Sequence, residues 1–294
     1  MSNQNNPWAL VLSGGGARGF AHIGFLKELE KSGFPRPSLV VGTSMGAIVG
    51  GLYACGMTTA PMERFVCEEF NITDYLESFT FRINGPVGKV FQTGQALASL
   101  ATRPGMDTGQ RVLELLEDLS GGKRFDETDI PFRCNAMDIL TGREAVFSTG
   151  SVARAIRASM SFPVFFEPFE ENGMYLVDGG LWDNMPVAIA RKEGFKHTLA
   201  VNVNRFAPQE LGDLRTGPQV IYRCIEGALN AMQNVKKVQA ELTLDITDDA
   251  TPFSFLRQRE FIELGEQAVR RNLKTLEDFF ESRFGFFRKH TVCS

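Results

Sequence analysis

The sequence predicts an α/β protein with three layers, α/β/α, in which helices cover both faces of a mainly parallel central sheet. Three observations favour this class. Apolar runs at 9–13 and 39–41 each end at small residues, and each leads directly into a helical pattern. Such alternation is typical of parallel strands, because these need a crossover connection. The 294-residue chain is also 43% hydrophobic, which is enough to build one large core.

The N-terminal elements follow one another closely. The strand at 9–13 stops at three consecutive glycines, which is typical of a buried strand followed by a tight turn. The helix predicted for 20–32 has apolar residues on one face and charged residues on the other, and Gly33 ends it. The second buried strand, 39–41, is followed at once by a helix of small residues that continues to Ala54. These elements form a βαβ unit with one further helix.

The remaining elements are less closely spaced. Strands are expected at 131–136, 144–147, 175–177 and 198–203, a short helix at 151–158 capped by Ser151, and longer helices at about 218–242 and 260–284. The stretch from about 58 to 122 is mainly helical, and an insertion of this size is a common place for a lid or a substrate-binding wall. We expect one large domain, 8–205, with 206–294 as a mainly helical extension packed on or beside it.

Charge and composition exclude several classes of protein. Lys and Arg total 31 against 35 Asp and Glu, and the net charge of −4 argues against nucleic-acid binding through a broad basic surface. The five cysteines include no CxxC pair, and the three histidines share no metal-ligand spacing. We therefore expect no metal and no cofactor. The lack of a signal-like N-terminus and of an apolar run of about 18 residues predicts a cytoplasmic protein.

The segment Gly42-Thr43-Ser44-Met45-Gly46 is a G-x-S-x-G motif between a predicted strand and a predicted helix. In a nucleophile elbow the serine occupies a sharp strand-to-helix turn, and the flanking Gly42 and Gly46 leave room for its backbone. The hydroxyl then faces the positive end of the helix dipole. This setting favours a nucleophilic Ser44 over a capping serine in an ordinary turn.

A second motif, Gly14-Gly15-Gly16-Ala17-Arg18-Gly19, lies at the end of the first strand and opens a helix. Successive backbone N–H groups without Cβ obstruction form an anion site, so this loop is a candidate oxyanion hole. The same residues fit G-x-G-x-x-G, which makes dinucleotide binding the alternative. That fingerprint needs an acidic residue at the end of the second strand, and the G-x-S-x-G motif stands there instead.

None of the three histidines has the setting of a catalytic base. His22 lies one turn into the first helix and fits a structural role. His197 precedes a strand and is expected in an exposed turn, and His290 belongs to a basic tail. An ordinary Ser-His-Asp triad is therefore not predicted.

Asp178 is the better candidate for the proton acceptor. It ends an apolar strand and precedes Gly179 and Gly180, so its carboxylate can lie where parallel strands end, at the edge at which α/β folds place their sites. An unperturbed aspartate, with a pKa near 3.9, is a poor base for a serine hydroxyl. Partial desolvation by apolar neighbours would raise the pKa and make the carboxylate usable.

In this order, the motifs resemble the patatin-like phospholipase family. The resemblance rests on the glycine loop at 14–19, the G-x-S-x-G at 42–46 and Asp178-Gly179-Gly180. The segment Arg157-Ala158-Ser159-Met160-Ser161-Phe162-Pro163 resembles a further block of the family. His22-Ile23-Gly24 and Asn184-Met185-Pro186 resemble its bacterial and neuropathy-target-esterase branch. The match extends from about residue 8 to about residue 205.

The resemblance implies a patatin-like fold and a Ser44–Asp178 dyad without histidine. Backbone N–H groups around Gly15 and Gly16 would form the oxyanion hole, and Arg18 would help to hold the loop or the developing charge. It also implies a lipid acyl hydrolase of the phospholipase A or lysophospholipase type. A non-catalytic lipid-binding or regulatory module and an acyltransferase with the same acyl-enzyme step are the alternatives.

The C-terminal segment 279–290 mixes phenylalanines with cations. This composition is typical of a segment at a lipid interface, with rings at the acyl boundary and cations on the head groups. The alternative is a last helix that packs on the domain and ends in a basic tail. The sequence thus predicts a lipid ester as substrate, and for this segment it leaves open both peripheral contact with a membrane and packing on the domain.

Overall fold

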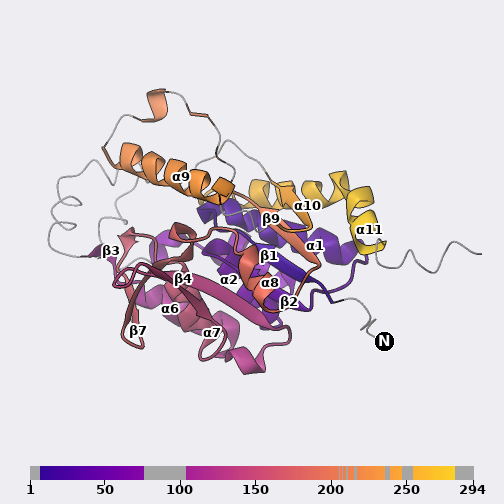
Figure 1. Cartoon of the computed structure of the whole chain (residues 1–294), viewed down its shortest axis with the longest axis horizontal. Helices are drawn as coiled ribbons and strands as arrows, with labels where there is room; N and C mark the ends of the chain where they lie inside the picture. The colour runs from indigo at the N-terminus through magenta and orange to yellow at the C-terminus, as the bar shows by residue number, and fades with distance from the viewer. Residues whose placement is uncertain are drawn as a thin grey trace, which may run out of the picture.

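The computed structural model describes residues 7–75, 104–204, 206, 208–209, 211–214, 217–235, 239–246 and 254–281. Within these ranges the chain forms an α/β fold around one mixed sheet of eight strands (Figure 1). Five neighbouring strands are parallel, in the order β10 (Leu242–Asp245), β9 (Thr198–Asn202), β1 (Ala9–Leu12), β2 (Leu39–Gly42) and β4 (Phe132–Asp138). All residues of β1 and β2 are buried, as expected for strands covered on both faces.

Alternate residues of β1 face two separate apolar clusters. Leu10 and Leu12 pack with residues of α1 (Ala21–Lys31), α2 (Met45–Ala54) and α10 (Gln258–Arg271). Ala9 and Val11 pack on the opposite face, with residues of α8 (Val187–Lys192). Helices therefore lie on both sides of the sheet, and the three-layer prediction is confirmed (Figure 1).

Two strands meet end to end along one edge of β4. β2 pairs with β4 in parallel up to Gly42 opposite Cys134. β8 (Met174–Asp178) pairs with β4 in the antiparallel sense, with Asp178 opposite Ala136. Because β5 (Arg143–Phe147) occupies the other edge of β4 from Cys134 onward, β2 and β8 must share an edge. Their carboxyl ends therefore point towards each other, with one residue of β4 between them.

This arrangement corrects one prediction about Asp178. The sequence argument placed it at the end of a parallel strand, whereas its strand runs antiparallel to β4 and reaches the same place from the opposite direction. The physical reason is that β4 extends beyond the end of β2, and the free edge is filled by a strand that returns from a hairpin. The hairpin joins β7 (Phe169–Glu171) to β8 through Asn172 and Gly173, at φ 51° and 77°. Two positive φ angles at Asn-Gly are typical of a type I′ turn.

The described parts of the predicted insertion 58–122 are mostly helical. They form α3 (Thr59–Arg64), a π-helical turn η2 (Phe65–Glu69), a 3-10 turn η3 (Ile72–Asp74) and α6 (Gln110–Ser120). The short strand β3 (Gly105–Asp107) is an exception, because it pairs in parallel with β6 (Val164–Phe166) outside the insertion. Residues 76–103 lie outside the described residues. Of the remaining predicted elements, α7 (Val152–Ser159) begins as expected, with Ser151 Oγ accepting a hydrogen bond from Arg154 N–H.

The C-terminal third departs from the two long helices that the sequence predicted. The first is α9 (Gly217–Val235), and Leu242, the predicted last residue of that helix, begins strand β10 instead. No element was predicted for 243–245, where Leu244 is buried between exposed Thr243 and Asp245 in the two-residue period of a short strand. The second is divided at Asn272 into α10 and α11 (Leu273–Glu281). Since β10 extends the central sheet, the predicted boundary at residue 205 falls between two neighbouring strands, and the two-part division stays a prediction. Within the described residues, no helix is both long and apolar enough to span a membrane.

The prediction that His197 lies in an exposed turn is wrong. The His197 side chain is completely buried: its Nδ1 lies 2.6 Å from Glu241 Oε2 and its ring stacks on Phe279. Phe279 and Phe280 are also buried, and both pack against Trp8. For these two rings the structure agrees with the alternative given above, a last helix packed on the domain, and peripheral membrane contact through the rest of the segment stays a prediction. The cationic part of the segment, with His290, lies outside the described residues.

Helices α1 and α10 cross at two glycines. A Cβ on Gly24 would lie 1.8 Å from the carbonyl oxygen of Ile262, and one on Gly265 would lie 2.0 Å from that of Ala21. Neither space admits a methyl group without moving a backbone. The contact therefore brings α10, from the C-terminal third, against the first helix of the chain.

We expect Gly24→Ala to reduce the free energy of unfolding by about 2 kcal/mol or more, because the added methyl group forces the two helices apart. The measurement is urea denaturation followed by circular dichroism. Gly227→Ala in α9 is the matched control, since its Cβ would only come to 3.8 Å from Phe206. Helix propensity should leave that variant unchanged or stabilised by up to about 1 kcal/mol. Equal stability of Gly24→Ala and wild type would contradict the tight crossing.

Candidate active site

Ser44 occupies a sharp turn between β2 and α2. Its φ of 53° and ψ of −122° are rare for a residue with a side chain, which is the strained geometry expected of a nucleophile elbow. Gly46 permits the turn, because a Cβ there would lie 2.3 Å from the carbonyl oxygen of Leu12. The Ser44 N–H donates to Ser159 Oγ at 2.9 Å. The backbone of the elbow is thus held from α7 as well as from the sheet.

The Ser44 hydroxyl donates a hydrogen bond to Asp178 Oδ2 at 2.6 Å. The other carboxylate oxygen, Oδ1, accepts from the N–H of Gly180 at 2.7 Å. Asp178 is only 3% exposed, and burial raises the pKa of its carboxyl to about 6, although the hydrogen bonds from Ser44 and Gly180 act in the opposite direction. The carboxyl is therefore a stronger base than a solvated aspartate, and it still ionises below neutral pH.

The segment 157–163 supports both members of this pair. Ser159 at the end of α7 accepts from the elbow, as described above, and the carbonyl of Ser161 accepts from the N–H of Asp178 at 2.9 Å. Arg157, which is 1% exposed, donates to Ser161 Oγ at 2.5 Å. Through Arg157, Ser159 and Ser161, this segment thus connects the elbow after β2 to strand β8, which carries Asp178. In the sequence, segment 157–163 was noted only for its resemblance to the family, and nothing there indicated that it holds both Ser44 and Asp178.

Asn135 fills the gap between the ends of β2 and β8. Its Oδ1 accepts from Thr43 Oγ1 at 2.7 Å, next to the nucleophile. Its Nδ2 donates to the carbonyl of Asp183 at 3.0 Å, and more weakly to that of Gly179 at 3.4 Å. This fully buried amide therefore ties the elbow to the turn after Asp178. Sequence reasoning missed Asn135, because nothing in the strand pattern of 131–136 distinguishes it.

The glycine loop lies beside Ser44. A Cβ on Gly14 would lie 3.1 Å from Ser44 Cβ, and one on Gly19 would overlap Met45. Asn184 clamps the loop: its carbonyl accepts from the Gly14 N–H at 3.1 Å, and its Nδ2 donates to the Gly14 carbonyl at 3.2 Å. The predicted oxyanion residues are therefore next to the nucleophile.

Two donors of this loop are available for a ligand. Within the described part of the chain, no hydrogen bond engages the N–H of Gly15 or Gly16. The peptide unit is planar, with its C=O and N–H pointing in opposite directions. Since Asn184 holds the Gly14 carbonyl from one side, the Gly15 N–H is directed to the other. These two donors match the oxyanion positions that the sequence predicted.

The two described histidines are engaged elsewhere. His22 is completely buried, with its Nε2 2.8 Å from the carbonyl of Ser13, and burial lowers the pKa of its ring to about 4. It therefore stays neutral and supports the strand that leads into the glycine loop. His197 contacts Glu241, as described above. Among the residues that the structure describes, no three His, Cys, Asp or Glu side chains are grouped as they would be around a metal ion.

Comparison with known proteins identifies the family. A model of the patatin-like phospholipase family matches residues 10–191. The chain belongs to the patatin-like phospholipase family. The matched range includes the glycine loop, the elbow, Asn135 and the Asp178 turn, and it ends before β9, β10 and helices α9 to α11.

Several relatives within this family carry the name Lysophospholipase NTE1. The protein of Saccharomyces cerevisiae is 33% identical over 218 residues, and that of Yarrowia lipolytica is 31% identical over 238 residues. These alignments cover 72% and 79% of this chain but only 12% and 16% of the fungal proteins. The chain thus spans a small part of the length of these relatives. Among solved structures, VipD from Legionella pneumophila superimposes with a TM-score of 0.52 at 17% identity, covering 93% of this chain and 68% of VipD, and therefore shares the fold.

The raised pKa of Asp178 predicts a pH-dependent loss of stability. Between about pH 4 and pH 6 the folded protein binds a proton at Asp178 that the unfolded chain has already released, so the free energy of unfolding falls as pH rises through this window. This pKa shift contributes about 3 kcal/mol to the free energy of unfolding below about pH 4, and the contribution is lost once the pH is well above 6.

Asp178→Asn removes this titration, so the variant should be more stable than wild type at pH 8 and about equally stable at pH 4. Urea unfolding at both pH values measures the difference, with Asp118→Asn on the exposed face of α6 as control. A constant difference between wild type and Asp178→Asn across this range would contradict the desolvated carboxyl.

Proposed function

We propose that the protein is a serine esterase that hydrolyses lipid acyl esters, of the phospholipase A or lysophospholipase type. The observation that carries the proposal is the 2.6 Å hydrogen bond from a strained elbow serine, Ser44, to the buried Asp178. Membership of the patatin-like phospholipase family supports the class of reaction. The printed name of the fungal relatives, lysophospholipase, supports a lipid with an ester-linked acyl chain as substrate.

In the proposed first half-reaction, Ser44 Oγ attacks the ester carbonyl carbon while its proton passes to Asp178 Oδ2. The N–H groups of Gly15 and Gly16 donate to the oxyanion of the tetrahedral intermediate. As the intermediate collapses, the ester C–O bond breaks and the leaving alcohol takes the proton from Asp178. The acyl chain is then bound to Ser44 as an ester.

In the second half-reaction a water molecule attacks the acyl-enzyme. Asp178 accepts a proton from the water and returns it to Ser44 Oγ as the fatty acid leaves, so the enzyme is regenerated. Asp178 can serve in both directions because its pKa, about 6, lies near neutral pH. A histidine is not needed, since the carboxyl contacts the serine directly.

A fluorophosphonate probe should label the wild-type protein at Ser44, because the probe traps an activated serine as a covalent analogue of the tetrahedral intermediate. Ser44→Ala should abolish both the labelling and the release of fatty acid from lysophosphatidylcholine, measured by mass spectrometry of the products. Ser159→Ala serves as a comparison. It keeps the nucleophile but removes the hydrogen bond from the Ser44 N–H, so labelling and fatty-acid release should be reduced and not abolished. Labelling that persists in Ser44→Ala would exclude this nucleophile.

The rate constant kcat/KM should rise with pH through an ionisation near 6, since only the ionised Asp178 accepts the serine proton. Initial rates on a monomeric short-chain ester between pH 4.5 and 8 measure the profile. Asp178→Asn should lower kcat by about 10³-fold or more while its circular dichroism spectrum stays that of wild type. A profile that is flat from pH 4.5 to 8 would argue against a carboxylate base.

A further inference from the structure

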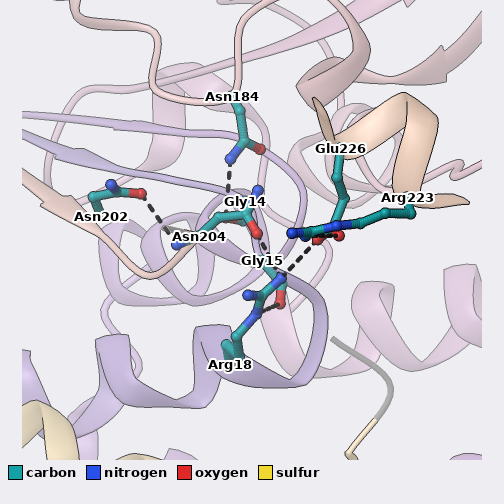
Figure 2. A network of polar contacts seen from close by, with 8 residues as sticks. All are labelled: Gly14, Gly15, Arg18, Asn184, Asn202, Asn204, Arg223 and Glu226. Atoms are coloured by element: carbon teal, nitrogen blue, oxygen red, sulfur yellow. Dashed lines mark hydrogen bonds and ion pairs between the residues drawn. The ribbon is translucent and has the colours of Figure 1, made fainter. Parts of the chain in front are cut away.

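Arg18 of the glycine loop contacts three separate parts of the chain (Figure 2). Its Nε donates to the carbonyl of Gly15 at 3.4 Å. Its Nη2 lies 2.5 Å from Asn204 Oδ1, just after β9, and 3.3 Å from Glu226 Oε1 on α9. The arginine is 8% exposed, so these groups largely replace water around the guanidinium.

Glu226 is held between two arginines. Its second carboxylate oxygen accepts from Arg223 Nη1 at 3.2 Å, and the Arg223 guanidinium lies 3.6 Å from the centre of the Phe206 ring. The Glu226 side chain is 11% exposed and that of Arg18 is 9% exposed. A partly buried carboxylate between two guanidinium groups is screened less by solvent than a surface ion pair. Replacing it by glutamine would remove the negative charge that both guanidinium groups contact.

Asn204 is itself positioned by the edge of the sheet. Its N–H donates to Asn202 Oδ1 at 3.1 Å, and Asn202 Nδ2 donates to Asp245 Oδ1 on β10 at 2.8 Å. A chain of hydrogen bonds therefore runs from β10 through Asn202 and Asn204 to Arg18 and the glycine loop, and Figure 2 shows the part from Asn202 onward. Both Asn204 and Glu226 lie beyond the range 10–191 that matches the family.

The contact between Arg18 and the Gly15 carbonyl has a consequence for the next peptide group. Because C=O and N–H of one peptide point in opposite directions, a carbonyl of Gly15 held towards Arg18 directs the Gly16 N–H away from it. Gly16 N–H is one of the two free donors of the loop. The 3-10 turn η1 (Gly16–Phe20) begins here, so its backbone also engages the Gly15 carbonyl, and the Arg18 guanidinium adds a second contact that reinforces this orientation of the Gly16 N–H.

We propose that Glu226 and Asn204 are positioning residues for the oxyanion loop, acting through Arg18. They hold the guanidinium against the Gly15 carbonyl and thereby aim the Gly16 N–H at the reacting ester. Arg18 then serves the loop backbone and does not bind the oxyanion itself. The inference rests on the proposed esterase function, and it makes α9 and the end of β9 part of the active site.

A double-mutant cycle tests this inference. We expect Glu226→Gln to lower kcat on a monomeric short-chain ester by about tenfold and to change KM by less than twofold, because a misaimed donor affects the transition state more than substrate binding. Asn204→Ala should act in the same direction without altering α9. In an Arg18→Ala background, Glu226→Gln should cause no further loss, since its effect passes through Arg18.

Glu260→Gln is the matched control, because it removes an exposed Arg–Glu pair at the same i,i+3 spacing on α10. It should leave kcat unchanged. Wild-type kcat in both Glu226→Gln and Asn204→Ala would overturn the inference, as would losses that multiply in the double variant. A wild-type protein that neither hydrolyses esters nor reacts with the fluorophosphonate would instead contradict the proposed function, and with it this catalytic role. If the wild-type protein is labelled and active, and Glu226→Gln and Asn204→Ala both keep its kcat, the result contradicts the positioning role alone and leaves the proposed function intact.

Discussion

The geometry of the candidate site depends on one constraint, which is that β2 and β8 end against each other on the same edge of β4. Gly42 and Asp178 pair with β4 residues only two positions apart, so the turn that carries Ser44 and the carboxyl of Asp178 meet in the remaining gap. The register of a strand is set by its backbone hydrogen bonds and by which of its side chains face the core. A slip by one residue would change the hydrogen-bonding partners and turn every side chain to the opposite face of the sheet. The distance between hydroxyl and carboxyl is thus determined mainly by the sheet. Asn135, which stands in the gap, accepts a hydrogen bond from Thr43 there and so connects the elbow to β4.

The same junction explains why a carboxyl can be buried there. Asp178 loses solvation, which disfavours its ionised form, and it recovers part of this loss through the hydroxyl of Ser44 and the N–H of Gly180. A fold selected for stability alone would place a neutral group at this position. The backbone of Ser44 is also unfavourable for stability, because a positive φ is strained for a residue with a side chain. This conformation persists because Ser159 and the sheet hold the turn. A buried carboxyl and a strained backbone, each unfavourable for stability, therefore occur at the same site. This combination is typical of functional sites.

Sequence reasoning succeeded where a feature is local. The elbow, the glycine loop and the capped start of α7 are each defined within a few residues, and each is found where the pattern indicated. It failed where a feature depends on distant partners. The direction of β8 follows from the free edge of β4, β10 is too short to show its two-residue period, and His197 is buried only because α11 packs over it. Asn135 and Glu226 are ordinary polar residues in their own segments, and Asn184 was marked by resemblance without a role; the fold brings all three to the loop and the elbow. The Asn172-Gly173 turn was a readable signal for the hairpin that was overlooked.

The long sequence separations across the site have a consequence for folding. Ser44 and Asp178 are 134 residues apart, Gly14 and the Asn184 amide 170, and Arg18 and Glu226 208. As the chain is synthesised from its N-terminus, β1, α1, β2 and α2 can form first, and at that stage the elbow has neither its carboxyl nor the clamp on its glycine loop. Contacts of such separation form late, because the entropy of closing the loops must be overcome before they contribute. An unfinished chain therefore lacks the carboxyl and the clamped glycine loop on which the proposed mechanism depends, and these are completed only by parts of the chain that are synthesised much later.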